Sequence, residues 1–185
     1  MPKLGMEPIR RAALVKATIA EVGDAGSLDV PVARIARRAG VSAALAHHYF
    51  GGKEQIFTAA MRQILRDYRA EVVRQLGQGG DRTAAIVRAN FAPSCFAPEV
   101  VAAWMTFYAA AQTSPQARRL LRLYQRRLRS NLAHGLRGQV ADPAAAAETL
   151  AATIDGLYIR QAYSDPAPDG AALVLRLLDT LRRSS

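Results

Sequence analysis

The segment from Val32 to Phe50, VARIARRAGVSAALAHHYF, constrains the fold of this 185-residue chain more than any other. A helix-turn-helix needs two short helices held at a steep angle by a turn of three or four residues. Gly40 can adopt the left-handed backbone conformation that a residue with a Cβ atom resists. Ser42 can cap the following helix, because its hydroxyl accepts a hydrogen bond from a first-turn N–H. The segment therefore predicts a helix-turn-helix. The outward-facing positions of its second helix are Ala43, Ala44, His47 and His48.

The rest of the chain is divided into helices by proline, glycine and capping residues. Apolar residues recur at helical spacing from Phe57 to Leu76, which is typical of one long helix. No stretch alternates with the two-residue period of a strand, so the sequence predicts an all-α protein of about nine helices. The expected helices begin near Pro8, Pro31, Ser42, Lys53, Asp81, Pro98, Ser114, Asp142 and Asp169.

This order of helices predicts two functional parts. Residues 1–53 are expected to form a three-helix head that contains the helix-turn-helix, and residues 54–185 to form a helical body. The resemblance described below implies that the head binds DNA and that the body senses a ligand and dimerises. The helix over 54–76 connects them, and the glycine-rich stretch 77–80 ends it. Such a division suits a chain of this length, which has room for one small head and one sensing body.

The net charge of +10 comes almost entirely from arginine, since the chain has only three lysines. An excess of basic residues favours a protein that binds a polyanion, and nucleic acid is the first candidate. The alternative is a soluble protein that is basic but binds no polyanion. Three arginines, Arg34, Arg37 and Arg38, flank the predicted turn. They are either a solvated charged face or, for one or two of them, phosphate contacts.

The single cysteine, Cys95, excludes a disulfide within the chain and is expected to be a small core residue. The opening residues lack a signal-peptide pattern, and the longest apolar run, 100–111, is too short for a membrane span of roughly 20 residues. We therefore expect a cytoplasmic protein.

The adjacent pair His47 and His48 is a possible but disfavoured metal site. Neighbouring residues on a helix point in different directions, and no Cys or Glu lies at ligand spacing from them.

The expected recognition helix lacks Arg, Lys, Asn and Gln between Ala43 and Tyr49, so the strongest bidentate base contacts are absent. Affinity is then expected to depend on phosphate contacts and on dimerisation, with alanine side chains against thymine methyl groups.

Residues 9–57 resemble the DNA-binding head of the TetR family of bacterial repressors. The resemblance lies in IARRAGVS, followed by the aromatic-rich HHYFGGKE and its lysine. It implies that Ser42 caps the recognition helix, while Tyr49 and Lys53 contact phosphates. The family often has glycine where Ala44 stands and tyrosine where His47 stands, so the operator sequence does not follow from the resemblance. The expected DNA-binding residues are Val32, Arg34, Arg37, Gly40, Ser42, Ala43, Ala44, His47, His48, Tyr49 and Lys53.

Aromatic residues and one acid mark the expected ligand site in the body. Trp104 shares a helix face with Phe107 and Tyr108, and a later segment places Asp155 and Tyr158 in an apolar helix. Aromatic rings and a carboxylate are what a quaternary ammonium needs, and each ring contributes roughly 0.5–2 kcal/mol. On these residues alone, an ordinary core with Asp155 paired to an arginine is the more common arrangement.

Further segments resemble a choline-sensing branch of the same family that represses glycine betaine synthesis genes. They are MPKLGMEPIRR at the start, AW-x-x-F, RRL-x-SNL at 126–132 and IDGL at 154–157. This resemblance implies a repressor relieved by choline. A repressor for another small molecule, such as a drug, an acyl compound or an aromatic ligand, is the alternative.

No cofactor is expected, and no catalytic triad, carboxylate pair or metal spacing supports an enzyme. A short recognition helix makes few base contacts, so we expect a homodimer on a palindromic operator. The last two helices, Pro143–Tyr163 and Ala171–Leu181, are expected to form the dimer interface. The apolar residues assigned to it are Leu150, Ile154, Leu157, Val174, Leu177 and Leu178.

Overall fold

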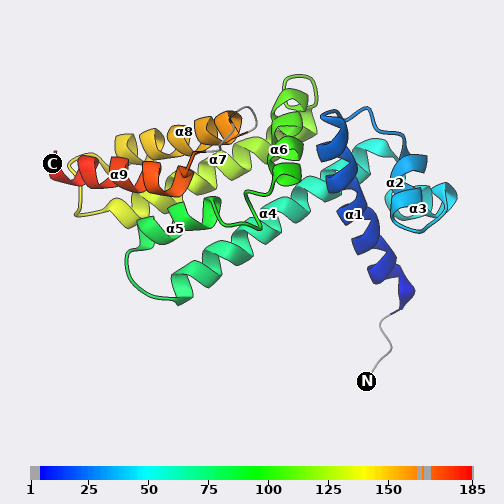
Figure 1. Ribbon diagram of the computed structural model, residues 1–185, viewed down its shortest axis with the longest axis horizontal. Coiled ribbons are helices and arrows are strands. Elements are labelled where there is room, and N and C mark those ends of the chain that lie inside the picture. The colour runs from blue at the N-terminus through cyan, green and yellow to red at the C-terminus, as the bar shows by residue number, and fades with distance from the viewer. Residues whose placement is uncertain (1–4, 162–163, 165–167, 185) are drawn as a thin grey trace. The chain divides into compact units, whose positions relative to one another are not determined.

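The computed structural model describes residues 5–161, 164 and 168–184. In this part of the chain it contains nine α-helices and no strand, which confirms the all-α prediction (Figure 1). The helices are α1 (Met6–Ala25), α2 (Val32–Arg38), α3 (Ala43–Phe50), α4 (Lys53–Gly77), α5 (Arg82–Asn90), α6 (Pro98–Ala110), α7 (Pro115–Leu136), α8 (Pro143–Gln161) and α9 (Gly170–Arg183).

Side-chain caps set the starts of five of these helices, α3, α5, α7, α8 and α9, where the sequence predicts them. The Ser42 hydroxyl accepts a hydrogen bond from the Leu45 N–H at 3.2 Å. The carboxylates of Asp81 and Asp169 accept comparable bonds at the starts of α5 and α9. Each cap satisfies a backbone donor that the first turn of a helix leaves unpaired.

The chain divides into two compact units. The N-terminal unit comprises the residues up to Ile64 together with Pro98–Arg118, and the C-terminal unit comprises Leu65–Ala97 and the residues from Arg119 onward. The division falls within α4 and places α6 in the same unit as the helix-turn-helix. The predicted functional boundary at residue 53 lies earlier in the chain and stays a prediction.

In the N-terminal unit, α1 packs against both α6 and α2. A close approach at Gly23 makes the contact with α6 possible, because a Cβ atom there would lie 2.7 Å from the backbone oxygen of Glu99. Leu14 and Ile35 are fully buried in this unit. The packing of α1 therefore fixes the position of the helix-turn-helix on its own unit.

In the C-terminal unit, α9 packs against α8 and α5. An ion pair between Arg182 and Asp81 ties the end of α9 to the start of α5. The core of this unit includes the fully buried aliphatic residues Leu132, Leu136 and Ile154.

Five of the six residues predicted for the dimer interface are wrong. Of the six, Leu177 is half-buried, and the other five are at most 6% exposed within a single chain. A side chain that already fills the core of its own unit cannot cover a second copy. The predicted end of the eighth helix at Tyr163 lies outside the described residues.

No described helix is both long and apolar enough to cross a membrane. Cys95 is buried, as expected, and its burial raises the pKa of the thiol.

Candidate DNA-binding surface and ligand sites

Helices α2 and α3 form the predicted helix-turn-helix. Gly40 lies between them with a φ of +69°, in the left-handed region that glycine tolerates. The Val41 N–H donates to the Ala36 oxygen at 3.0 Å and closes the turn. Ile35, Ala36 and Ala46 are at most 1% exposed. The two helices therefore share a closely packed contact, which only small side chains at 36 and 46 allow.

The outer face of α3 is exposed but carries no arginine or lysine. Ala44, His47 and His48 are exposed, whereas Ala43 is half-buried. Tyr49 is also half-buried, and the Arg11 guanidinium lies 5.3 Å from the centre of its ring. This face can offer methyl groups and imidazoles to a DNA groove, while Tyr49 is held by a residue of α1.

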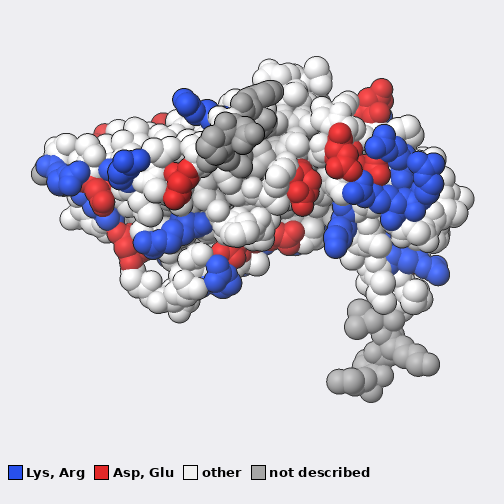
Figure 2. Space-filling model, in the orientation of Figure 1, with Lys and Arg blue, Asp and Glu red and all other residues white. Residues whose placement is uncertain are grey.

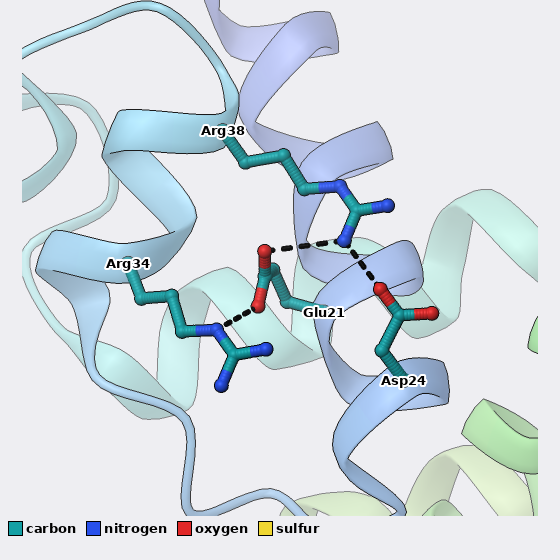
Figure 3. Close-up of polar contacts among 4 residues, drawn as sticks. All are labelled: Glu21, Asp24, Arg34 and Arg38. Atoms are coloured by element: carbon teal, nitrogen blue, oxygen red, sulfur yellow. Dashed lines mark hydrogen bonds and ion pairs between the residues drawn. The ribbon is translucent and has the colours of Figure 1, made fainter.

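Basic side chains gather over α2, next to acidic ones (Figure 2). Figure 3 shows how two of them are held by α1. The buried carboxylate of Glu21 pairs with Arg34 and, at 3.1 Å, with Arg38. Arg38 also pairs with Asp24 at 2.5 Å, and the hydrogen bonds to Asp24 and Glu21 raise the pKa of its guanidinium. These ion pairs attach α2 to α1.

The role of Glu21 was missed in the sequence, although a signal was present. Glu21 falls on the apolar face of the first helix, seven residues after Leu14, where a charged residue is rarely left without a partner. The two arginines of α2 that are predicted to contact phosphates therefore differ in whether they are already in an ion pair. Arg34 is engaged by Glu21, whereas Arg37 is exposed and takes part in none of these ion pairs.

Lys53, the first residue of α4, is also engaged. Its Nζ lies 2.7 Å from Oδ1 of Asp29 and 5.9 Å from the centre of the Phe57 ring. The hydrogen bond from Lys53 lowers the pKa of the Asp29 carboxyl. A DNA phosphate that contacts Lys53 must therefore compete with Asp29.

Three predicted ligand residues form an aromatic cluster in the N-terminal unit. The Trp104 ring stacks on Phe107 at 5.7 Å between centres and meets Tyr108 edge-on at 5.8 Å. Trp104 and Phe107 are about 5% exposed or less. Phe107 also lines a cavity of about 480 Å³ inside this unit.

The other two predicted ligand residues, Asp155 and Tyr158, belong to the C-terminal unit. The Tyr158 hydroxyl donates to the Asn90 oxygen at 2.7 Å, and its ring lies 4.9 Å from Phe96. Tyr158 therefore holds the segment after α5 in place.

The carboxylate of Asp155 accepts a long hydrogen bond, 3.5 Å, from the Tyr124 hydroxyl. Tyr124 in turn meets Tyr68 edge-on at 6.0 Å. Burial raises the pKa of Tyr68, so its hydroxyl stays neutral. An acid beside a pair of tyrosines has the composition of a cation site. Sequence reasoning missed Tyr68 and Tyr124 because each belongs to the apolar repeat of a long helix.

The five predicted ligand residues thus divide into two groups, one in each compact unit. Within the described part of the chain, no group of three His, Cys, Asp or Glu side chains could hold a metal ion.

Two family models match most of the chain. One, described as bacterial regulatory proteins of the tetR family, covers residues 14–60. The other, described as the C-terminal part of BetI-type transcriptional repressors, covers residues 79–183. The first match contains the helix-turn-helix with Lys53, and the second contains all five predicted ligand residues.

A curated relative covers nearly the whole chain. The HTH-type transcriptional regulator BetI of Brucella melitensis biotype 2 is 49% identical over 185 residues, which cover 97% of this chain and 93% of the relative.

Solved structures share the fold. A transcriptional regulator from Pseudomonas aeruginosa PAO1 has a TM-score of 0.77 at 25% identity, covering 98% of this chain and 93% of that one. A regulator from Saccharomonospora viridis, solved in complex with choline, has a TM-score of 0.75 at 20% identity, covering 91% and 93%.

Proposed function

This chain belongs to the TetR family of bacterial regulators, with a BetI-type C-terminal domain, and from this premise we propose that it represses choline uptake and glycine betaine synthesis genes until choline binds. Regulators of this family bind DNA and small-molecule effectors and act as dimers, and they are not enzymes. The observation that carries the proposal is the 49% identity to a BetI regulator over 97% of the chain.

DNA binding is proposed to occur through α3, with its exposed residues Ala44 and His47 toward the bases. Lys53 and Arg37 are proposed to contact phosphates beside it. Because α3 carries no residue that makes a strong bidentate base contact, two copies on a palindromic operator are needed for useful affinity. Half-sites about one helical turn apart, or a multiple of this, suit such a dimer.

The dimer is proposed to form through α8 and α9, but by residues other than those first expected. Ile159 on α8 is 54% exposed, and Leu173 on α9 is 37% exposed. The exposed side of α8 also carries the small residues Ala152 and Gly156, and a Cβ atom at 156 would meet nothing within 4 Å. Small residues beside exposed apolar ones allow two helices to approach closely.

Ile159→Arg tests this interface. We expect the variant to be monomeric at micromolar concentration and to bind operator poorly, because two charges would face each other across the two-fold axis. Ile9→Arg is the matched control, since Ile9 is equally exposed on α1. Light scattering measures both. A dimeric Ile159→Arg protein would contradict the interface.

Choline is the proposed inducer because both candidate groups contain the aromatic rings that attract a quaternary ammonium. The group with Asp155 and Tyr124 also supplies a carboxylate. A regulator of the same fold was solved with choline, which supports the choice. The two groups lie in different units, so each is tested by its own variant.

The test is a titration of the protein–operator complex with choline. Wild type should release operator at millimolar choline, and Asp155→Asn should need at least about tenfold more if the carboxylate balances the ligand charge. Trp104→Ala tests the aromatic group in the same way, and both variants should bind operator normally without choline. A wild-type complex that ignores choline would contradict the inducer, whereas an unchanged variant would contradict only its own site.

A further inference from the structure

The cavity of about 480 Å³ lies wholly within the N-terminal unit. Its walls come from α1, α4, α6 and the first turn of α7, and from the segment between α1 and α2. Val22, Phe57, Met61, Ile64 and Phe107 are among its apolar wall residues. Pockets that hold drug-sized molecules measure about 300–1,000 Å³ and are mostly apolar, so this cavity has the size and lining of a ligand site.

The interior offers little to a polar ligand. Two of its wall hydroxyls are already used by the backbone beside them. Thr18 donates to the Leu14 oxygen at 2.7 Å, and Ser114 accepts from the Ala117 N–H at 3.2 Å. Thr58 is the other hydroxyl of the wall, and the remaining wall residues away from the mouth are apolar, so a molecule enclosed here needs a mainly apolar body.

The charged wall residues, Asp29, Lys53 and Glu54, mark the mouth of the cavity. The Asp29 side chain is 95% exposed, Lys53 is 41% exposed, and Glu54 is also exposed. Lys53 is paired with Asp29, whereas Glu54 takes part in no ion pair with any residue that the structure describes. Two acids and one base give the mouth an excess of one negative charge.

The mouth already holds an ammonium group, which belongs to the protein itself. The Lys53 Nζ lies between the Asp29 carboxylate, at 2.7 Å, and the Phe57 ring, at 5.9 Å from its centre. A carboxylate and an aromatic face are the two partners that favour a cation. The geometry therefore accommodates an ammonium at the point where the apolar cavity opens.

From these observations, we propose that the cavity binds a hydrophobic amine, with its alkyl or aryl body enclosed and its ammonium group held at the mouth by Asp29 and Glu54. This site differs from the choline site proposed at Asp155, which lies in the other compact unit, and it selects an extended apolar body. It shares Phe107 with the Trp104 group. A bound amine competes with Lys53 for Asp29. Because Lys53 is also the proposed phosphate contact, the amine alters operator affinity.

Three probes that share an alkyl chain and differ in head group test which head group the site prefers. They are decylammonium, decanol and decanoate, each added to the full-length protein. Trp104 is the only tryptophan in the chain and stacks on the wall residue Phe107, so its fluorescence reports occupancy. We expect the amine to bind best and the carboxylate worst, with at least about a tenfold difference in Kd between them. Equal affinities for the three probes, or no binding of decylammonium, would overturn the proposal.

Variants then test the site. Glu54→Gln should weaken decylammonium severalfold and leave decanol unchanged, and this exposed position carries little risk to folding. Glu7→Gln removes the same charge from the same unit away from the cavity and should change neither probe. Ala60→Phe should fill the cavity and abolish binding of both probes, with circular dichroism as the check on folding. If Glu54→Gln and Glu7→Gln behave alike, the assigned head-group site is wrong.

Competition with choline separates this site from the proposed inducer site. Excess choline should leave decylammonium bound, because it lacks the apolar body that the cavity encloses. Displacement of decylammonium by choline would place both in one site and overturn the proposal, while the choline response itself would stand.

Discussion

The two helices of the DNA-binding motif differ in how they carry charge. Helix α2 holds three arginines, and two of them are paired with acids of α1. Helix α3 holds no arginine or lysine, and its exposed face consists of alanine and histidine side chains. The cations proposed to contact phosphates therefore lie beside the recognition helix, and all of them except Arg37 are paired with Glu21, Asp24 or Asp29. We therefore expect base recognition and phosphate affinity to depend on separate elements, so that variants can change one without the other.

The largest expected effect comes from removing the acid that holds α2. Glu21→Ala should lower the free energy of unfolding by about 2 kcal/mol, because the variant lacks a buried carboxylate with two arginine partners, although both arginines remain partly solvated. Glu7→Ala, which breaks the exposed pair with Arg11, should cost at most about 0.5 kcal/mol. Urea denaturation measures both. Equal costs for the two variants would contradict a structural role for Glu21.

A change on α3 should alter specificity instead of general affinity. Ala44→Leu adds bulk to an exposed position of the recognition helix and should shift the preferred operator base by about 1–2 kcal/mol. The expected reason is steric, since the longer side chain reaches a different part of the groove. Selection of binding sites from a random DNA pool measures the preference. An unchanged consensus would mean that position 44 does not face the bases.

Lys53→Ala should lower general DNA affinity and leave the preferred operator sequence unchanged. It removes a cation beside α3, so binding to all DNA sequences should weaken alike, and the salt slope should fall by about one for each phosphate that the lysine no longer neutralises. Lys16→Ala is a matched control because Lys16 is an exposed lysine of α1 outside the motif. Operator titrations between low and moderate salt measure the slope. A changed base preference with an unchanged slope would show that Lys53 does not bind a phosphate.

The smallest expected effect is an increase in operator affinity. Asp29→Asn removes the acid that competes for Lys53, so operator affinity should rise a few-fold at low salt. The pKa of Asp29 is lowered by Lys53, so the carboxylate is charged at neutral pH and the ion pair breaks only as the pH falls below the ordinary value of 3.8. The gain should therefore be constant across neutral pH. Operator titrations at about pH 6 and pH 8 check this, and weaker binding by Asp29→Asn would contradict the competition.

The candidate DNA-binding site could be predicted from sequence because its residues act over short distances in the chain. The turn needs Gly40, the cap needs Ser42, and the packing between the helices needs small residues at 36 and 46. All of these lie within one segment of 19 residues, and α2 and α3 follow from it. The starts of the later helices were predictable for the same reason, since each cap bonds to an N–H two or three residues away.

The dimer residues show where such reasoning fails. Leu150, Ile154 and Val174 form an apolar pattern that suits either a core or an interface, and the pattern alone does not distinguish them. In the structure all three are fully buried within one chain, and Ile159 and Leu173 are the large apolar residues that the same helices expose. Which side of an amphipathic helix faces its own unit depends on the neighbouring helices.

The sequence by itself determined the all-α class, the helix limits and the helix-turn-helix, because caps, turns and helical periodicity are local properties of the backbone. Only the tertiary structure decided which basic side chains are paired with acids and where a cavity opens. Glu21 meets Arg38 across 17 residues, and Asp29 meets Lys53 across 24. The cavity is lined by residues as far apart in the chain as Val22 and Phe107. Contacts between residues so far apart depend on how the helices pack, and local patterns do not encode that packing in a readable form.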